Sequence, residues 1–460
     1  MNFIGRKKEL EILNASFLSN QQESILIYGR RRIGKTELIK AAFSKMDVPV
    51  IYYESKQTTE QSNVESMAQL ICEIFNLPPL AFLSFEQLLD YVFQLGVEKK
   101  LIFVLDEYPY LRSCIKGMDS IIQSVIDKYV HTSKIKFILC GSYVDVMKSL
   151  VDYENPLYGR FTKIIDLKPM DYYESSLFYP SFSNAEKVEL YSVFGGVPYY
   201  NRLIDENRSV KENIVQLIAS QNSLLLNEVP MYIRNEISKI NHANEVFEVL
   251  ALGITKFTDI LSKSHIKSSP ILTEILNKLT KMEIVEKKAP INDPNNKKKS
   301  GYYIKDNFVL FYYKYIFRNI SRLNVMNEIV FYNRYIEPDF TKNHVPHVFE
   351  DVCRQFLVRK NKMGNIDVPF FDIGKYYYDD PVNKKNGEFN IVTEDDQGYI
   401  FYECKFRNEK ITNTMIEKEI EQVNQTSLEC YKYGFFSKSG FESREQANCI
   451  YYGLDDLYKE

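Results

Sequence analysis

The segment from residue 24 to residue 36 has the sequence Ser24-Ile25-Leu26-Ile27-Tyr28-Gly29-Arg30-Arg31-Arg32-Ile33-Gly34-Lys35-Thr36. A short apolar run, typical of a buried strand, ends at Gly29, and residues 29–36 fit the pattern G-x-x-x-x-G-K-[ST]. Residues 37–46 then place apolar side chains along one side of a helix. Strand, glycine loop and helix in this order form the context that the pattern requires. The alternative is a chance match in an ordinary turn between a strand and a helix.

A loop of this kind binds the phosphates of a nucleoside triphosphate. Glycines allow the backbone to curl so that successive N–H groups point toward phosphate oxygens, and the helix N-terminus adds partial positive charge. Lys35 supplies a point charge for the β- and γ-phosphates, and the Thr36 hydroxyl can bind Mg²⁺. The sequence therefore predicts that residues 29–36 bind ATP together with Mg²⁺.

The composition is that of a globular protein with several domains. The 460 residues suggest about three domains, and the apolar content of 45% is ample for packed cores. A net charge of −3 shows no nucleic-acid footprint over the whole chain, so any such binding would come from a local basic patch. Scattered cysteines, a charged N-terminal segment and the lack of a long apolar run predict a cytoplasmic protein without membrane contact.

Apolar runs alternate with helical patterns over the first 170 residues, which predicts a mainly parallel sheet covered by helices on both faces. The five runs are Ile25–Tyr28, Val50–Tyr53, Leu101–Leu105, Lys136–Cys140 and Ile164–Leu167. A long helical insertion, interrupted at Pro78-Pro79, separates the second run from the third.

Polar residues that follow these runs are the catalytic candidates. The third run ends in Asp106-Glu107, where the Asp of an ATPase holds Mg²⁺ and the Glu polarises the attacking water. The fourth run leads to Ser142, which is either a γ-phosphate sensor or an ordinary turn serine. Arg160 could reach a γ-phosphate, in its own chain or a neighbour's, as an arginine finger; a surface arginine is the equal alternative.

A glycine pair marks the end of the next predicted helix, which begins near Asn184. Gly195-Gly196 is a helix stop, and Pro198 starts the following element. This pattern predicts a hinge between the sheet domain and a small helical lid.

Taken together, these motifs resemble the archaeal-type P-loop ATPases, a branch related to the STAND NTPases. The residues that carry the resemblance, over roughly residues 1–235, are Phe3-Ile4-Gly5-Arg6 with Glu9-Leu10, Gly29-Arg30-Arg31-Arg32-Ile33-Gly34-Lys35-Thr36, Asp106-Glu107, Gly141-Ser142, Gly159-Arg160 and Gly195-Gly196-Val197-Pro198. The resemblance implies that Gly5 and Arg6 lie near the adenine and that Pro198 senses the nucleotide between domains.

Residues 244–304 have the pattern of a winged helix-turn-helix, three helices followed by a hairpin. Lys297-Lys298-Lys299 lies at the tip of the wing, where a basic patch can contact DNA phosphates. The third helix offers few side chains for reading base edges, and the alternative is a solvated charged loop. Further along, residues 307–340 are aromatic and helical, and His344-x-x-His347, interrupted by Pro346, is interpreted as a loop and not as a metal-ligand pair.

A second candidate site lies in the last domain, on a helix and on the two strands of a hairpin. Its residues are Glu350, Glu388, Asn390, Glu403 and Lys405. Because side chains alternate along a strand, Glu388 and Asn390 share one face, as do Glu403 and Lys405. Carboxylates with a lysine at a hairpin can bind Mg²⁺ and activate water for phosphodiester cleavage.

Residues 325–460 resemble the PD-(D/E)xK nuclease-like domain that is commonly appended to archaeal-type ATPases. Glu403-x-Lys405 matches the family's E-x-K, and Glu350 matches its helix acid. The family's metal-binding Asp falls on Asn390, whose amide keeps the shape but removes the charge, so metal affinity should be lower. Glu388, two residues away, could compensate; the alternative is a retained fold with weak or no nuclease activity.

We therefore predict an α/β protein with a P-loop NTPase parallel sheet, covered by helices on both faces, a winged helix and a restriction-endonuclease-like domain. The expected boundaries are 1–205 for the ATPase domain, 206–240 for a helical lid or linker, 241–322 for the winged helix and 323–460 for the nuclease-like domain. The expected function is an ATP-hydrolysing switch that acts on the C-terminal module. A non-catalytic, nucleotide-gated DNA-binding regulator or partner-binding scaffold is the alternative. Expected partners are ATP or ADP, DNA through the winged helix or C-terminal domain, and another copy of the chain.

Overall fold

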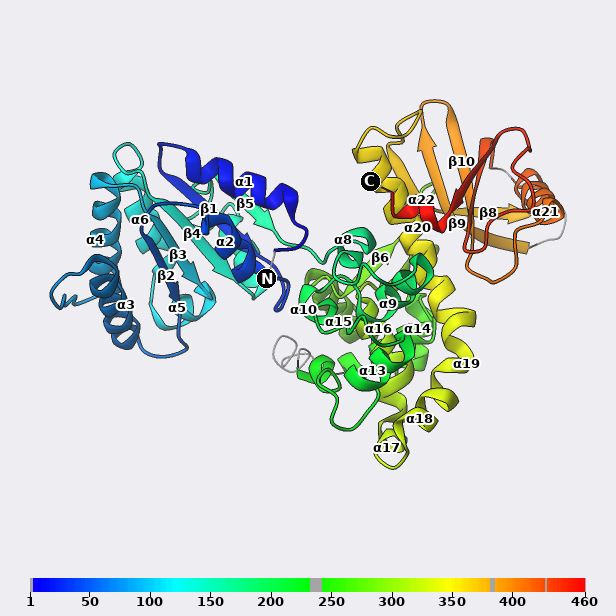
Figure 1. Cartoon of the computed structure of the whole chain (residues 1–460), viewed down its shortest axis with the longest axis horizontal. Coiled ribbons are helices and arrows are strands. Elements are labelled where there is room, and N and C mark those ends of the chain that lie inside the picture. Colours follow the sequence, from blue (N-terminus) through cyan, green and yellow to red (C-terminus); the bar gives the residue numbers. More distant parts are fainter. Residues whose placement is uncertain (1–2, 232–241, 381–384, 427, 460) are drawn as a thin grey trace. The chain divides into compact units, whose positions relative to one another are not determined.

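The computed structural model describes residues 3–231, 242–380, 385–426 and 428–459, and the chain divides into two compact units. The first unit comprises Met1–Pro169 with Val197–Tyr199, and the second comprises Met170–Gly196 with Tyr200–Glu460 (Figure 1). No helix within the described ranges combines the length and the apolar character that a bilayer span demands.

The first unit contains a five-stranded parallel sheet with the strand order β2-β3-β4-β1-β5. Its strands are β1 (Glu23–Tyr28), β2 (Val50–Glu54), β3 (Ile102–Asp106), β4 (Lys136–Gly141) and β5 (Lys163–Asp166). The two central strands β3 and β4 are buried at every residue, as expected where helices cover both faces. The predicted parallel sheet is confirmed.

Helices cover this sheet on opposite faces. They are α1 (Lys7–Leu18), α2 (Lys35–Phe43), α3 (Glu60–Phe75), α4 (Phe85–Glu98), α5 (Tyr108–Cys114), α6 (Met118–Tyr129) and α7 (Val144–Lys148). Leu26 and Phe103 point into the core that α3, α4 and α6 share. Their strand neighbours Ile25 and Val104 are equally buried but point the other way, because side chains alternate along a strand.

The helices α8 (Tyr172–Ser176) and α9 (Asn184–Phe194) belong to the second unit, although the sequence predicts residues 1–205 as the ATPase domain. They are followed by α10 (Pro198–Asn201), whose first two residues group with the first unit, and by α11 (Val210–Leu217), which lies in the predicted lid or linker. The last turns of α9 bond to later segments: the Asn307 amide donates to the Tyr191 carbonyl at 2.9 Å, and His344 Nε2 lies 2.9 Å from the Ser192 carbonyl. These bonds place α9 with the second unit, although the expected ATPase boundary was residue 205.

Three helices and a hairpin follow, as predicted for the winged helix. They are α13 (Ala243–Ala251), α14 (Phe257–Lys263), α15 (Ser269–Lys281), β6 (Val285–Lys288) and β7 (Gly301–Ile304), with β6 and β7 antiparallel. Residues 232–241, at the end of the expected linker, lie outside the described residues.

The segment after the hairpin is helical and aromatic, as predicted. It contains α16 (Asn307–Phe311), α17 (Ile320–Leu323), α18 (Glu328–Tyr335), α19 (Glu337–Asp339) and two π-helical turns, Tyr312–Ile316 and Phe340–His344.

The predicted loop at His344-x-x-His347 is wrong, because α20 (Val345–Lys362) begins directly after His344. Pro346 lies in the first turn of this helix, where its missing N–H costs nothing. Burial lowers the pKa of His344 to about 3, so this histidine is a neutral member of the core.

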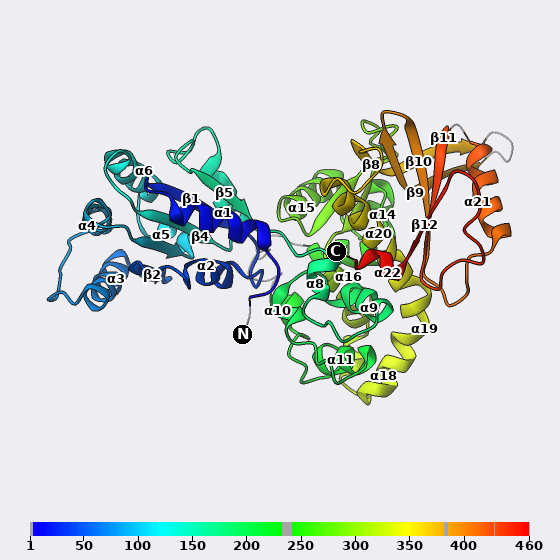
Figure 2. The ribbon, with the colours of Figure 1, turned by 45° about the horizontal axis from the view of Figure 1, so that its top comes forward.

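The C-terminal domain contains a second, mixed sheet with the order β12-β11-β10-β9-β8 (Figure 2). Its elements after α20 are β8 (Asp372–Asp380), β9 (Lys385–Asp395), β10 (Gly398–Lys405), α21 (Asn413–Asn424), β11 (Cys430–Ser437), β12 (Cys449–Gly453) and α22 (Leu454–Leu457). Strands β8 to β10 are antiparallel neighbours, whereas β10, β11 and β12 are parallel. The predicted fold class, a parallel P-loop sheet followed by a separate α/β sheet domain, is confirmed.

The close approach of Gly196, in the glycine pair after α9, to the backbone of Met170 can be tested by substitution. Gly195 has φ 59°, and a Cβ on Gly196 would lie 1.9 Å from the Met170 carbonyl oxygen. We predict that Gly196→Ala lowers the free energy of unfolding by about 1–3 kcal/mol, because the backbone must move to admit the methyl group. Urea unfolding followed by circular dichroism measures the change. Gly453→Ala is the matched control, since Gly453 has φ −91° and its Cβ would meet only ordinary contacts, the nearest at 3.7 Å; equal losses in both variants would contradict the prediction.

Candidate functional site

The glycine loop connects β1 to α2 at the carboxyl edge of the parallel sheet. A Cβ on Gly29 would lie 2.4 Å from the Leu167 carbonyl oxygen, so only glycine fits there. Gly34, at the N-terminus of α2, has φ 91°, a conformation that favours glycine. Ile33 is fully buried and anchors the loop. The backbone therefore has the curl that the sequence predicts.

Lys35 is the first residue of α2 and is buried. Its Nζ donates hydrogen bonds to the carbonyls of Gly29 at 2.8 Å and Arg30 at 3.1 Å. The ammonium group thus lies inside the curl of its own loop, where it can meet the phosphates of a bound nucleotide.

Asp106 at the end of β3 is the centre of a small hydrogen-bond network. Its Oδ2 accepts a bond from the Thr36 hydroxyl at 3.1 Å and a second bond from the Tyr52 hydroxyl, while Oδ1 accepts the Glu107 N–H at 2.9 Å. Burial, followed by the negative charge of Asp106, raises the pKa of Tyr52, so the phenol stays a neutral donor. The contact of α2 with β3 through Thr36 and Asp106 is the one expected of a magnesium-binding pair.

The oxygen atoms at this position suit Mg²⁺. Thr36 and Asp106 offer a hydroxyl and a carboxylate, both hard oxygen donors, 3.1 Å apart. Mg²⁺ in nucleotide sites takes one or two carboxylates and completes its shell with phosphates and water. Among the residues that the structure describes, no group of three His, Cys, Asp or Glu side chains could hold a metal ion. The two residues therefore fit a magnesium ion shared with phosphate, and not an all-protein metal cage.

Glu107 and Ser142 are brought together by the neighbouring strands β3 and β4. Glu107 Oε2 accepts bonds from the Ser142 hydroxyl at 2.9 Å and from the Ser142 N–H at 3.3 Å. Glu107 has φ 49°, in the left-handed region that few non-glycine residues adopt. Ser142 thus holds the carboxylate of Glu107 in a defined position.

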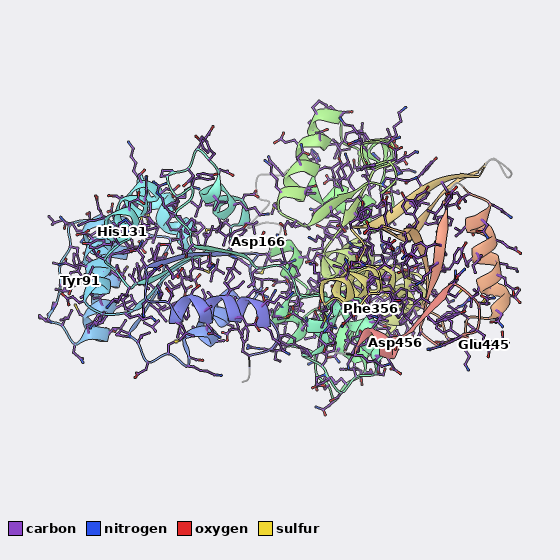
Figure 3. All side chains as sticks on the ribbon, turned by 90° about the horizontal axis from the view of Figure 1, so that it is seen from above. Tyr91, His131, Asp166, Phe356, Glu445 and Asp456 are labelled. Carbon is purple, nitrogen blue, oxygen red and sulfur yellow. The ribbon has the colours of Figure 1, made fainter. Side chains whose placement is uncertain are left out.

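The Gly5-Arg6 pair lies at the same edge of the sheet. Both residues have positive φ, 70° and 58°, and Arg6 is buried at the N-terminus of α1. The Arg6 guanidinium donates a 2.6 Å bond to the carbonyl of Lys168, directly after β5. β5 ends at Asp166, labelled in Figure 3, which pairs with the Lys168 ammonium at 2.6 Å.

The other arginines of the loop face aromatic residues. The Arg31 guanidinium donates to the Tyr110 hydroxyl at 3.2 Å, and the Arg32 guanidinium lies 4.2 Å from the centre of the Tyr199 ring. Pro198 lies beside Gly34, with its Cγ 3.8 Å from the position of a Cβ on that glycine. The segment Val197–Tyr199, which groups with the first unit, therefore touches the glycine loop.

Arg160 is not brought to this site. Its guanidinium donates to Asp127 Oδ2 at 3.1 and 3.2 Å and to the Tyr158 carbonyl at 2.9 Å. Two residues later, the Thr162 N–H bonds to the carbonyl of Ser24, near the start of β1, so Arg160 lies at the amino edge of the sheet. This placement does not fit a role at the glycine loop of its own chain; a role toward a neighbouring chain stays a prediction.

The parallel sheet, the curled loop after β1 and the acid at the end of β3 define the first unit as a P-loop ATPase domain. A family model agrees, since residues 3–205 match an ATPase domain predominantly from Archaea. Residues 312–423 match a second family, described as archaea bacterial proteins of unknown function.

Individual relatives extend these matches. The chain is 28% identical over 461 residues to the uncharacterized protein MJECL04 of Methanocaldococcus jannaschii, covering 99% of this chain and 100% of that protein. The uncharacterized ATP-binding protein MJ0423 of the same organism is 53% identical over 38 residues, 8% of this chain and 64% of that protein.

Two solved structures are similar to the chain. The Walker-type ATPase PABY2304 of Pyrococcus abyssi has a TM-score of 0.49 and 21% identity, over 68% of this chain and 96% of that one. The ORC2 protein of Aeropyrum pernix, in complexes with ADPNP and ADP, has a TM-score of 0.44 and 14% identity, over 70% and 96% of the two chains.

The structure brings together some of the residues predicted for the second candidate site. The Asn390 amide on β9 donates to Glu350 Oε1 on α20 at 3.0 Å. Lys405 pairs with Glu403 on its own strand and with Glu419 Oε1 on α21 at 3.0 Å. Burial, with the negative charge of Glu403 as the next cause, raises the pKa of Glu350 to about 7.

Glu388 has a partner that the sequence did not suggest. The Lys375 ammonium on β8 lies 2.5 Å from Glu388 Oε1 and 3.1 Å from the Tyr303 hydroxyl on β7. Sequence reasoning missed Lys375 and Glu419 because their strand and helix are brought to the site by tertiary packing alone.

The loop between β6 and β7, residues 289–300, lies against β8; because the sequence predicts it as the wing of a winged helix, we call it the wing. The Ile291 N–H donates to the Lys375 carbonyl at 2.8 Å, and the Asn292 side chain bonds to both the carbonyl and the N–H of Tyr377 at 2.7 and 3.0 Å. Lys299 pairs with Asp293 at 3.0 Å, whereas Lys297 and Lys298 are exposed. Only these two lysines of the predicted basic tip are therefore available to a phosphate backbone.

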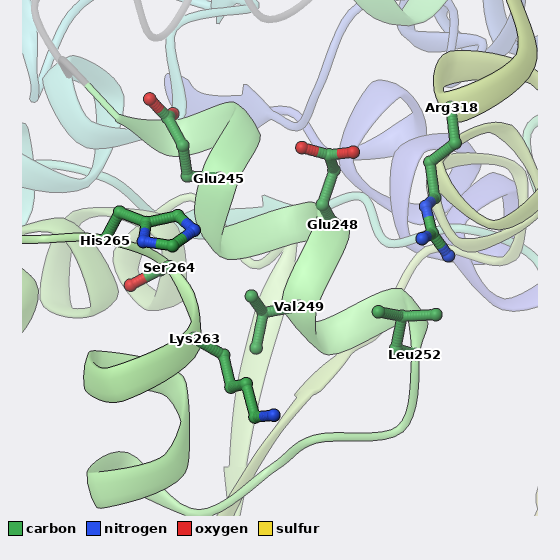
Figure 4. A pocket seen from close by; sticks show the side chains of 8 residues that line it. All are labelled: Glu245, Glu248, Val249, Leu252, Lys263, Ser264, His265 and Arg318. Atoms are coloured by element: carbon green, nitrogen blue, oxygen red, sulfur yellow. The ribbon is translucent and has the colours of Figure 1, made fainter.

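A cavity of about 200 Å³ lies beside α13 (Figure 4). Its lining includes two acidic residues, Glu245 and Glu248, and two basic residues, Lys263 and Arg318. This mixture of charges favours no single class of charged ligand.

Tyr52 is the residue of the nucleotide site that sequence reasoning missed, and it can be tested directly. We predict that Tyr52→Phe raises the Mg²⁺ concentration needed for half-maximal ATP hydrolysis by roughly tenfold, because outer-shell partners fix a metal-binding carboxylate. Phosphate release measured across a Mg²⁺ titration gives the value. Tyr53→Phe is the matched control, since the Tyr53 hydroxyl bonds to Asn63 at 2.8 Å and not to Asp106; an unchanged Mg²⁺ dependence in Tyr52→Phe would contradict the assignment.

Proposed function

We propose that this protein is an ATP-hydrolysing switch whose P-loop domain acts on a nuclease-like C-terminal module. The observation that carries the proposal is the contact of Thr36 with Asp106 next to the buried ammonium of Lys35. A cation, a hydroxyl and a carboxylate on two rigid elements are the set that a magnesium–triphosphate complex needs.

The residues of the loop would share the work of binding. The backbone N–H groups of residues 29–34 and the Lys35 ammonium would hold the β- and γ-phosphates. Thr36 and Asp106 would hold Mg²⁺, which when bound neutralises negative charge on the phosphates. Gly5 and Arg6, at the same edge of the sheet, would border the adenine.

Glu107 would orient the attacking water, and Ser142 would report on the γ-phosphate. The Ser142 hydroxyl donates to Glu107 in this structure, and the same proton could be donated to a γ-phosphate oxygen instead. A single hydroxyl would then couple phosphate binding to release of the catalytic carboxylate. Chemistry and sensing would thus share one hydrogen bond.

The signal would leave the site through residues 197–199. Pro198 lies beside Gly34 at the start of α2, with its Cγ 3.8 Å from the position of a Cβ on that glycine, and the chain runs directly from Gly195-Gly196 into this segment. A change in the curl of the loop would therefore act on the glycine pair in the second unit.

Two substitutions separate binding from turnover. We predict that Lys35→Ala abolishes ATP binding, because the phosphates lose their cation inside the curl. We predict that Glu107→Gln keeps ATP binding but reduces hydrolysis by at least about a hundredfold, since the amide cannot accept a proton from water. Calorimetric titration with ATP and steady-state phosphate release measure the two effects. Undiminished turnover in Glu107→Gln would overturn the role given to this residue.

The C-terminal module favours binding over cutting. Asn390 stands where the nuclease-like family has a metal-binding Asp, and its amide N–H is directed at Glu350. Partners would include DNA, reached through Lys297 and Lys298 or through the C-terminal sheet, and a second copy of the chain, toward which Arg160 could act. All seven cysteines are free thiols, which supports a reducing, cytoplasmic location.

A plasmid assay tests this preference. We predict no nicking of supercoiled DNA with Mg²⁺ or Mn²⁺ beyond the level of a Lys405→Ala control, because the centre lacks the acid that a metal would need. Agarose electrophoresis separates nicked from supercoiled plasmid. Metal-dependent nicking that disappears in Lys405→Ala would show instead that the module is a working nuclease.

A further inference from the structure

Each carboxylate of the C-terminal centre already accepts a hydrogen bond or ion pair from a nitrogen group. We define this centre as the side chains of Glu350, Lys375, Glu388, Asn390, Glu403, Lys405 and Glu419. Asn390 donates to Glu350, Lys375 pairs with Glu388, and Lys405 pairs with both Glu403 and Glu419. The acids of the centre are therefore distributed over three groups, each of which contains its own N–H donor.

The nuclease-like fold implies a divalent metal at this position, and the residues present do not fit one. A hard cation requires anionic oxygen ligands, but the acid of the second strand is the neutral amide of Asn390. An N–H group directed at Glu350 repels a cation that would approach that oxygen. Within the described ranges, no three acidic, His or Cys side chains converge as metal ligands.

Lys375 reaches the centre through an irregularity in the sheet. Gly374 pairs with Val392 and Tyr376 pairs with Phe389, so two residues of β9, Asn390 and Ile391, lie opposite Lys375 alone. This is a β-bulge, a device that re-aims side chains next to functional sites. The Lys375 ammonium consequently donates a hydrogen bond to Glu388 Oε1 at 2.5 Å. Glu388 shares its strand face with Asn390.

The winged-helix hairpin holds Lys375 in place from the other side. The Tyr303 hydroxyl on β7 lies 3.1 Å from the ammonium, and the Tyr303 ring centre lies 5.0 Å from it. The backbone of Lys375 also accepts the bond from Ile291 in the wing. Side chain and main chain of one residue are thus fixed by the neighbouring module.

We propose that Lys375 is the resident cation of the C-terminal centre, supplying the positive charge that a divalent metal supplies in an active nuclease of this fold. The centre then takes no Mg²⁺ or Mn²⁺, and Tyr303 locks the winged helix onto the C-terminal domain through this lysine. The positive charge of an ammonium paired with a carboxylate repels a metal ion that approaches the same carboxylate. Metal binding here is independent of nucleotide hydrolysis, so the two proposals fail separately.

Manganese titration of the full chain without nucleotide tests the proposal. All proteins carry Asp106→Asn, which removes the carboxylate of the nucleotide site, and free Mn²⁺ is followed by electron paramagnetic resonance. The protein with Lys375 and Asn390 intact should bind no Mn²⁺ in the millimolar range. Lys375→Met combined with Asn390→Asp should create a site at least tenfold tighter, and adding Glu403→Gln should remove it again.

Two further variants keep the test decisive if the double variant is poorly folded. Asn390→Asp alone should gain no Mn²⁺ site, because the ammonium of Lys375 pairs with the new carboxylate; Mn²⁺ binding by this variant would overturn the proposal. Lys432→Met, which removes a lysine 3.9 Å from the exposed Asp367 in the same domain, is the matched control and should change neither binding nor melting temperature. Mn²⁺ binding by the intact centre that Glu403→Gln abolishes would equally overturn it.

Discussion

The nucleotide site depends on one buried carboxylate, Asp106, at the edge where all strands of the first sheet end. A carboxylate that is only 4% exposed is stable when its oxygens accept hydrogen bonds. The donors are the Glu107 N–H, the Thr36 hydroxyl from α2 and the Tyr52 hydroxyl from β2. The two hydroxyls connect the helix of the glycine loop and the neighbouring strand to β3. The curl of the loop, the position of Lys35 and the bond between Glu107 and Ser142 all lie around that point.

The two candidate sites of the chain satisfy their acids with different donors, and the difference decides what each can bind. Asp106 is bonded to hydroxyls, and a hydroxyl oxygen keeps lone pairs, so Thr36 can turn from hydrogen-bond donor into a metal ligand. The acids of the C-terminal centre are bonded to ammonium and amide nitrogen, which have no lone pair to give. The side-chain donors to these acids are therefore hydroxyl groups in the first sheet and nitrogen groups in the second.

Sequence patterns predicted the residues that directly follow an apolar run. They missed the contacts that depend on which strands are neighbours in the sheet. Asp106, Ser142 and the glycine loop follow apolar runs directly, so their place at the carboxyl edge could be predicted. Tyr52 could not, because no periodicity reveals that β2 is the neighbour of β3. Arg160 precedes the parallel strand β5 and so lies at the amino edge of the sheet, which does not fit the predicted role at the glycine loop of its own chain. Pro346 suggested a loop, although the first turn of a helix accepts proline without loss.

The chain crosses from one unit to the other close to the glycine pair Gly195-Gly196. The backbone passes between the units after Pro169, after Gly196 and after Tyr199. The first two crossings are fastened to each other, because the Met170 N–H bonds to the Gly196 carbonyl at 2.8 Å and the bare Cα of Gly196 permits that approach. Under the role proposed for Pro198, a displacement of this residue would act two residues away from Gly196 and so close to both crossings.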